Sequence, residues 1–213
     1  MPDADHESRA AVVVAARSLN TQNLSPGASG NVSLRWGDGF LITPSALPYL
    51  QTEPHDIVYV TLDGRPEGPR RPSSEWRIHR DIYASRPDAG AVIHAHAPFA
   101  TTLACHERGI PPFHYMVAAA GGVDIRCAPY ATFGTQELSD LAMQALDDRR
   151  ACLLGHHGLL TLGESLEAAM QLAIEVEALA QQYWQALALG DPPLLTPAEM
   201  EDVLARFADY RAD

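Results

Sequence analysis

The stretch from residue 91 to residue 96, Ala91-Val92-Ile93-His94-Ala95-His96, is an apolar run that ends in two histidines one residue apart. Its length and content predict a buried strand. Successive side chains of a strand point to opposite faces, so His94 and His96 share a face and lie about 7 Å apart along the strand. Two imidazoles on one face form half of a metal site, and the segment therefore predicts both a strand and a pair of ligands.

A second apolar run, at residues 151–154, leads into Gly155-His156-His157-Gly158 and can deliver the third ligand at the end of another strand. Because side chains alternate along an extended chain, only one of His156 and His157 can face the same site. Three histidines hold a zinc-like ion and leave one coordination position open. An open position is typical of a catalytic metal, because substrate oxygens must displace water from it.

The composition restricts the partners of the chain. Its 213 residues, 46% hydrophobic and 20% charged, predict a single domain over residues 1–213. With 15 basic against 27 acidic residues the formal charge is -12, which argues against nucleic acid or an anionic membrane as a partner. The amino terminus has no basic segment followed by an apolar one, and no segment reaches about 20 apolar residues, so we expect a cytoplasmic protein.

The chain contains no lysine, since all 15 basic residues are arginines. A lysine Schiff base, a P-loop lysine and a lysine-anchored pyridoxal cofactor are therefore excluded. If the protein stabilises a carbanion, a metal must do so. The three cysteines have no C-x-x-C spacing and are expected to be reduced thiols.

Turn signals and hydrophobic periodicity divide the chain into helices and strands. We predict strands at residues 32–36, 39–43, 57–62, 91–96, 124–128, 151–154 and 159–161. We predict helices at residues 7–20, 73–85, 135–146, 165–189 and 197–209, and another that begins at Pro98. The early strands form hairpins and the later ones alternate with helices, which predicts an α/β layered domain with a central mixed sheet flanked by helices.

Three segments are suited to binding phosphate. Ser73-Ser74-Glu75 opens a predicted helix, and the first N–H groups of a helix are unpaired and partly positive. Residues 27–31 add N–H groups with little side-chain bulk, and Thr43-Pro44-Ser45 adds hydroxyl groups. An isolated glutamate in a first turn usually only complements the helix dipole. Beside an open metal, Glu75 becomes a candidate base for a proton next to a carbonyl, with the charge of the enediolate taken up by the metal.

Longer motifs carry a resemblance to a known family. They are Ala-Ser-Gly-Asn-Val-Ser-Leu-Arg from Ala28, Leu-Ile-Thr-Pro-Ser from Leu41, Pro-Ser-Ser-Glu-Trp-Arg from Pro72, His-Tyr-Met-Val-Ala-Ala-Ala-Gly-Gly from His114, Cys-Ala-Pro-Tyr-Ala-Thr-Phe-Gly-Thr from Cys127 and His-His-Gly from His156. Over nearly the whole chain these motifs resemble the class II aldolase and adducin family. The stretches from His114 and Cys127 are most similar to its fuculose phosphate branch.

The resemblance implies a mainly antiparallel sheet, one Zn²⁺ per subunit and a homotetramer with active sites between subunits. The metal ligands it implies are His94, His96, His157 and, at rest, Glu75, which acts as acid/base once substrate displaces it. The phosphate-binding positions it implies are Gly30, Asn31, Ser45, Ala46, Ser73 and Ser74. Tyr115 matches a tyrosine from a neighbouring subunit that protonates the aldehyde oxygen, while Phe133 and Tyr210 match residues around the aldehyde pocket.

One position departs from the family pattern. The family usually has glycine after the phosphate-binding hydroxyl residue, where this chain has Ala46. If the residue has a positive φ, alanine costs on the order of 1 kcal/mol and shifts the N–H group directed at phosphate.

The expected reaction is reversible cleavage of L-fuculose 1-phosphate, or a similar ketose 1-phosphate, to dihydroxyacetone phosphate and L-lactaldehyde through an enediolate. One alternative is a pentulose-phosphate 4-epimerase or a dehydratase that uses the same site. Another is an aldolase for a deoxypentulose 1-phosphate in nucleoside salvage. A third is an adducin-like assembly module, but such members typically lack the metal ligands.

Overall fold

The computed structural model describes the backbone of residues 2–212 and the side chains of residues 5–208. Within this range eight strands form one sheet in the order β4-β3-β2-β1-β5-β8-β7-β6. All neighbouring pairs are antiparallel except β6 and β7, which are parallel. The strands are β1 Asn31–Trp36, β2 Gly39–Ile42, β3 Val58–Thr61, β4 Pro66–Glu67, β5 Ala91–Ala95, β6 Arg126–Ala128, β7 Ala151–Leu154 and β8 Gly158–Gly163. The prediction of a mixed, mainly antiparallel sheet is confirmed.

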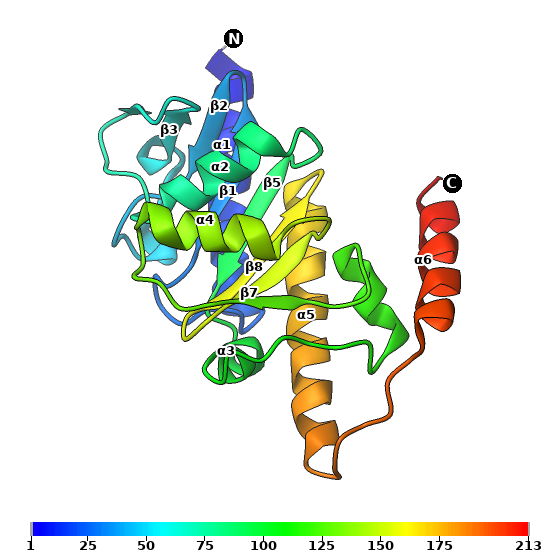
Figure 1. Ribbon diagram of the computed structural model, residues 1–213. Helices are drawn as coiled ribbons and strands as arrows, with labels where there is room; N and C mark the ends of the chain where they lie inside the picture. Colours follow the sequence, from blue (N-terminus) through cyan, green and yellow to red (C-terminus); the bar gives the residue numbers. More distant parts are fainter. Residues whose placement is uncertain (1, 213) are drawn as a thin grey trace.

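Helices cover both faces of the sheet (Figure 1). One buried apolar cluster joins one face to α1, α3, α5 and η3, and a second joins the opposite face to α2 and α4. The α-helices are α1 Pro2–Thr21, α2 Trp76–Ser85, α3 Pro98–Ala104, α4 Gln136–Ala145, α5 Leu166–Leu187 and α6 Pro197–Ala212. The 3-10 helices are η1 Tyr49–Gln51, η2 Pro54–Asp56 and η3 Tyr115–Ala120. Helix α6 contacts η3 and stands apart from the sheet (Figure 1).

Most helices begin where their capping residues predict. Thr135 and Ser165 accept N–H groups from the first turns of α4 and α5, and Pro98 is the first residue of α3. The expectation that Ser73 and Ser74 open helix α2 was wrong, because the helix begins at Trp76 and Glu75 is the residue before it. The Ser73 hydroxyl instead accepts the N–H of Glu75, which places the carboxylate at the start of the helix.

The sheet order brings separated segments to one end of β5. Strand β5 lies between β1 and β8, with His94 opposite Asn31 on one side and Leu160 on the other. The turn that precedes β8 carries His157. Among residues 2–212, no helix combines the length and apolar character that a bilayer crossing requires.

Candidate active site and metal centre

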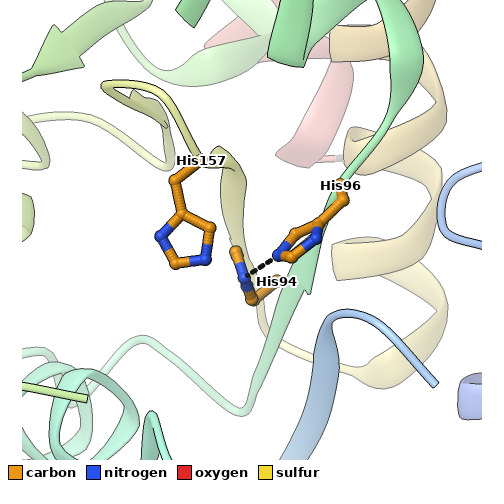
Figure 2. A group of neighbouring side chains, drawn as sticks. All are labelled: His94, His96 and His157. Atoms are coloured by element: carbon orange, nitrogen blue, oxygen red, sulfur yellow. Dashed lines mark hydrogen bonds between the residues drawn. The ribbon is translucent and has the colours of Figure 1, made fainter. Parts of the chain in front are cut away.

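Three histidines converge near the carboxyl end of β5. His94 lies in the strand, His96 directly follows it, and His157 lies in the turn between β7 and β8. One ring nitrogen from each lies within 4.8 Å of the others, and the ring centroids are between 4.7 and 4.9 Å apart. Figure 2 shows the three rings turned toward one another. The structure thus brings together the three histidines that the sequence singled out.

The neighbouring histidine is placed differently. His156 has a left-handed backbone with φ of 54°, so the alternation of an extended chain is broken at this point. Its ring lies edge-on to Tyr130, with 5.9 Å between the centroids. Of the two candidates that the sequence left open, His157 joins the cluster and His156 lines the wall beside it.

A backbone contact fixes the orientation of the most buried ring. His94 Nδ1 is 2.9 Å from the carbonyl oxygen of Leu159, to which it donates its hydrogen. His94 Nε2 is therefore the nitrogen with a free lone pair, and it lies 3.1 Å from His96 Nε2. A second nitrogen held by a carbonyl is the usual arrangement around a metal-binding histidine.

Glu75 closes the cluster from the start of α2. Its carboxylate is only 6% exposed, with Oε2 3.2 Å from His94 Nε2 and Oε1 3.2 Å from His157 Nε2. Oε2 also accepts a hydrogen bond of 2.9 Å from the side-chain amide of Asn31. Among the residues with described side chains, Oε1 finds no hydrogen-bond partner, although it is buried. A buried oxygen without a partner, beside three imidazole nitrogens, fits the donor set of a Zn²⁺-type ion.

Burial and the charges within the cluster together determine the pKa values of its four side chains. Burial and the neighbouring His94 lower the pKa of His96 and of His157 to about 4, so both rings are neutral at pH 7. Burial raises the pKa of Glu75, but the contacts with His94, His157 and Asn31 outweigh it and hold that pKa far below its usual range. Burial disfavours the charged form of His94, yet Glu75 raises its pKa above the usual value. Neutral imidazoles and an ionised carboxylate are the forms that bind a metal.

The cluster opens into a cavity of about 400 Å³. Its lining includes most of the residues that the sequence predicted for the site: Gly30, Asn31, Ser45, Ala46, Ser73, Ser74, Glu75, His96, Phe133 and His157. It also includes Ala28, Ser29 and Pro44 from the two predicted phosphate-binding loops, and His156. Tyr130 and Ala131 are lining residues to which the sequence reasoning gave no role. The carboxylate of Glu75, two of the three clustered histidines and the candidate phosphate positions therefore share one cavity.

Hydroxyl groups dominate the wall predicted to bind phosphate. The N–H groups of Glu75 and Trp76 already bond to Ser73, and the N–H of Ser45 bonds to the carbonyl of Arg71. The free helix N–H groups expected here are thus partly occupied. The side chains of Ser45, Ser73 and Ser74 remain as hydroxyl donors on this wall.

Backbone conformation is special at two positions of this wall. Gly30 has φ of 82°, and a Cβ there would lie 2.5 Å from the carbonyl oxygen of His94, so only glycine fits. Ala46 has φ of 59°, which is the condition under which alanine is strained. A residue with a Cβ in the left-handed region costs about 1 to 2 kcal/mol, and glycine avoids this cost.

The remaining predicted residues lie at the edge of the cavity or outside it. Phe133 lines the cavity mouth and is 65% exposed. Tyr115 begins η3, is 51% exposed and does not line the cavity of its own chain. The side chain of Tyr210 lies outside the described residues, although its backbone belongs to α6.

Sequence reasoning missed the polar side chains behind Glu75. Asn31, expected to bind phosphate, uses its amide to contact both Glu75 and His79. His79 in turn contacts Ser33. The signal was present as two spacings: Glu75 and His79 are four apart on a helix, and Asn31 and Ser33 two apart on a strand.

Comparisons with known proteins agree with this geometry. The family profile described as "Class II Aldolase and Adducin N-terminal domain" matches residues 10–184. A "5-methylthioribulose-1-phosphate/5-deoxyribulose-1-phosphate aldolase" from Rhodospirillum rubrum is 54% identical over 210 residues, which cover 99% of this chain and 95% of that protein. An "L-fuculose phosphate aldolase" from Escherichia coli K12 is 50% identical over 188 residues, or 88% of this chain and 87% of that protein. A solved structure named "L-fuculose 1-phosphate aldolase" has a TM-score of 0.92 at 38% identity, covering 95% of this chain and 96% of that one.

The chain belongs to the class II aldolase and adducin family. Within that family it is an aldehyde-lyase of the metal-dependent class II type, which its aldolase-named relatives and its histidine cluster both support. Both the resemblance seen in the sequence and the expected fold are confirmed.

We expect zinc to bind the metal-free protein more weakly as the pH falls. His96 and His157 remain neutral down to about pH 4, whereas Glu75 raises the pKa of His94 above its usual value, so His94 is the first of the three rings to gain a proton as the pH falls. One proton must leave for each metal bound, so the apparent Kd should rise about tenfold per pH unit below the pKa of His94. Competition titration between pH 5 and pH 8 measures this slope.

Two adjacent variants provide the control for that titration. His157→Asn should weaken zinc binding more than the 10- to 100-fold that an outer partner typically contributes. His156→Asn keeps a residue that tolerates positive φ and should bind zinc like the wild type. Equal weakening by both substitutions would contradict the ligand set.

We expect Ala46→Gly to stabilise the protein. Removing the Cβ relieves about 1 to 2 kcal/mol of left-handed strain, and the added freedom of the unfolded chain takes back about 0.4 to 1 kcal/mol. The free energy of unfolding from urea titration should therefore rise by roughly 0.5 to 1 kcal/mol. The matched control is Ala28→Gly, because Ala28 is also exposed on the cavity wall but has no positive φ. It should destabilise the protein, and a shift of the same sign in both variants would show that Ala46 is not strained.

Proposed function

We propose that the protein is a cytoplasmic, zinc-dependent aldolase that reversibly cleaves a ketose 1-phosphate to dihydroxyacetone phosphate and a short aldehyde through an enediolate. The observation that carries the proposal is the cluster of His94, His96, His157 and Glu75, because Glu75, His96 and His157 also line the cavity that carries the three serines. When bound, the metal would supply a Lewis acid that withdraws charge from the carbonyl of the substrate. The whole of residues 1–213 would act as one catalytic domain.

Residues of the chain would bind the metal, bind the phosphate and transfer the proton. His94, His96 and His157 would hold the ion, with Glu75 as a fourth ligand before substrate binds. The phosphate would be held by Ser45, Ser73 and Ser74 together with Gly30 and Asn31, which would orient the reacting carbons. In the synthetic direction Glu75 would remove a proton from the hydroxymethyl carbon of dihydroxyacetone phosphate, and in cleavage it would return that proton.

The aldehyde end would be completed by a second copy of the chain. Tyr115 is half exposed and outside its own cavity, which fits a tyrosine supplied to a neighbouring subunit of a homotetramer. There it would donate a proton to the aldehyde oxygen. Phe133 would line the aldehyde pocket, and Tyr210 would join it from α6.

Two groups of substrates agree with the names of the relatives. L-fuculose 1-phosphate would release L-lactaldehyde, whereas 5-deoxyribulose and 5-methylthioribulose 1-phosphates would release aldehydes without that hydroxyl group. The relative from Rhodospirillum rubrum is 54% identical over 99% of this chain, against 50% over 88% for the Escherichia coli relative. This difference favours the 5-deoxy and 5-methylthio substrates. The exposed rings of Tyr130 and Phe133 at the cavity mouth offer apolar surface for a methyl or methylthio group.

A substrate panel tests this proposal. Zinc-loaded protein is incubated with the three ketose 1-phosphates, and the released dihydroxyacetone phosphate and aldehyde are measured separately. We expect both products in equal amounts, with kcat/KM higher for the 5-deoxy and 5-methylthio substrates than for L-fuculose 1-phosphate. Conversion of a pentulose phosphate into its 4-epimer without release of aldehyde would instead identify an epimerase.

The substitution Glu75→Gln tests whether the carboxylate is catalytic or only complements the helix dipole. Losing a positioned base typically slows proton transfer 10²- to 10⁴-fold. The assay is exchange of the dihydroxyacetone phosphate proton with heavy water, which requires no aldehyde, and zinc content is measured beside it. Exchange at the wild-type rate by a zinc-replete variant would exclude Glu75 as the base.

The matched control for this substitution is Glu177→Gln. Glu177 accepts the N–H groups of Phe99 and Ala100 at the start of α3, so it caps a helix but does not line the cavity. We expect Glu177→Gln to lower the stability of the protein and to leave proton exchange unchanged.

A further inference from the structure

Behind Glu75, four buried polar side chains alternate between strand β1 and helix α2. Asn31 and Ser33 are two apart on β1, and His79 and Tyr83 are one turn apart on α2. All four are at most 2% exposed. Two residues along a strand and four residues along a helix cover similar distances. The side chains of the strand and the helix therefore interleave in the order Asn31, His79, Ser33, Tyr83.

Hydrogen bonds connect the four side chains to the carboxylate. The amide nitrogen of Asn31 is 2.9 Å from Glu75 Oε2, and the amide oxygen of Asn31 faces His79 Nε2. On the other side of the ring, His79 Nδ1 is 2.6 Å from the hydroxyl oxygen of Ser33. That oxygen is 2.8 Å from the hydroxyl of Tyr83. Every polar atom of the His79 ring therefore has a partner in this chain.

The charge of Glu75 sets the direction of each hydrogen bond. An ionised carboxylate only accepts, so Asn31 must present its NH₂ group to Glu75 and its oxygen to His79. His79 must then carry its hydrogen on Nε2. Complete burial keeps the ring neutral and lowers the pKa of His79 to about 3, so Nδ1 accepts the hydrogen of Ser33. Ser33 in turn accepts the hydrogen of Tyr83.

His79 in turn fixes the orientation of the Asn31 amide that faces Glu75. The two ends of the Asn31 amide have nearly the same shape, and rotation by half a turn would direct its oxygen at the carboxylate of Glu75. The Nε2–H of His79 excludes that orientation, because it would then face another donor. Arg35 anchors the far end, since its guanidinium lies 4.8 Å from the centre of the Tyr83 ring and donates to the Tyr83 carbonyl.

We propose that His79 is a positioning residue for Glu75, which through the amide of Asn31 holds the carboxylate in the orientation needed for metal binding and proton transfer. The role in proton transfer rests on the proposed aldolase function, whereas the fixed tautomer of His79 does not. Outer partners of a metal site typically contribute 10- to 100-fold to affinity or rate. His79 would act without touching either the metal or the substrate.

The tautomer is tested first, in the metal-free protein without substrate. Nitrogen-15 NMR of histidine-labelled protein distinguishes the two neutral tautomers, and the signals of His79 are assigned by their loss in His79→Gln. We expect a neutral ring with hydrogen on Nε2 that exchanges slowly with water. Hydrogen on Nδ1, or a mixture of the two tautomers, would overturn the proposal.

Two substitutions at the same position test the consequence for Glu75. His79→Gln places an N–H toward Asn31 and an oxygen toward Ser33, so it preserves the direction of the chain. His79→Leu fills similar space but removes both hydrogen bonds. At saturating dihydroxyacetone phosphate and full zinc occupancy, we expect proton exchange to fall 10- to 100-fold in His79→Leu and to stay close to wild type in His79→Gln. Zinc affinity, measured separately, should follow the same order.

Control variants keep this comparison decisive. Thr161→Val removes a different buried hydrogen bond, from the Thr161 hydroxyl to the Ala169 carbonyl on β8 and α5, and should leave exchange unchanged. If His79→Leu does not fold, Ser33→Ala takes its place, because it removes the donor to Nδ1, together with the acceptor of the Tyr83 hydroxyl, and keeps the His79 ring. Equal exchange rates and zinc affinities in the Leu (or Ser33→Ala) and Gln variants would overturn the positioning role. Absence of exchange in the wild type would instead refute the aldolase function, with the NMR result still deciding the tautomer.

Discussion

The buried carboxylate of Glu75 is the feature on which the rest of the site depends. An ionised carboxylate removed from water is strongly destabilising unless opposite charge and hydrogen bonds surround it. Glu75 is 6% exposed, and its partners are His94 from β5, His157 from the β7–β8 turn and Asn31 from β1. Because each partner comes from a different element, the carboxylate is stabilised only when α2, β1, β5 and the turn are all in place. A buried, ionised carboxylate at this position thus depends on the whole local fold.

Close backbone packing makes that arrangement possible. A Cβ on Gly158 would lie 2.3 Å from the carbonyl oxygen of Ala95, and a Cβ on Gly30 would lie 2.5 Å from that of His94. Both contacts join segments that flank the histidine cluster, so a side chain at either glycine would push β5 away from its neighbours. A displacement of about 1 Å is enough to impair a catalytic constellation severely. The His-His-Gly motif therefore holds His157 of the cluster and, in the next residue, the space that lets His157 approach β5.

Local patterns in the sequence predicted those parts of the site that depend on one element. The period of a strand was enough to pair His94 with His96, and helix and turn signals were enough for the layered α/β fold. Strand alternation alone left His156 and His157 open, and only the family resemblance implied His157; the structure supplies the physical reason, because positive φ at His156 breaks the alternation. The contact of Asn31 with Glu75 depends on the pairing of β1 with β5, which joins residues far apart in the chain. For the same reason the side chains behind Glu75 went unnoticed, although their spacings of two and four were visible.

The two ends of the cavity are under different physical constraints. At the histidine cluster, His94 and Glu75 are buried and hydrogen-bonded, so a change there leaves a charge or polar group without a partner. At the mouth, Tyr130 and Phe133 are 57% and 65% exposed, so their replacement disturbs little of the core. Relatives named for different substrates, fuculose phosphate and methylthioribulose or deoxyribulose phosphates, match this chain at 50% and 54% identity. Those substrates share a phosphorylated three-carbon end and differ at the aldehyde end. Under the proposed function, the tolerant side chains would lie where these substrates differ and the constrained ones where the common proton transfer would occur.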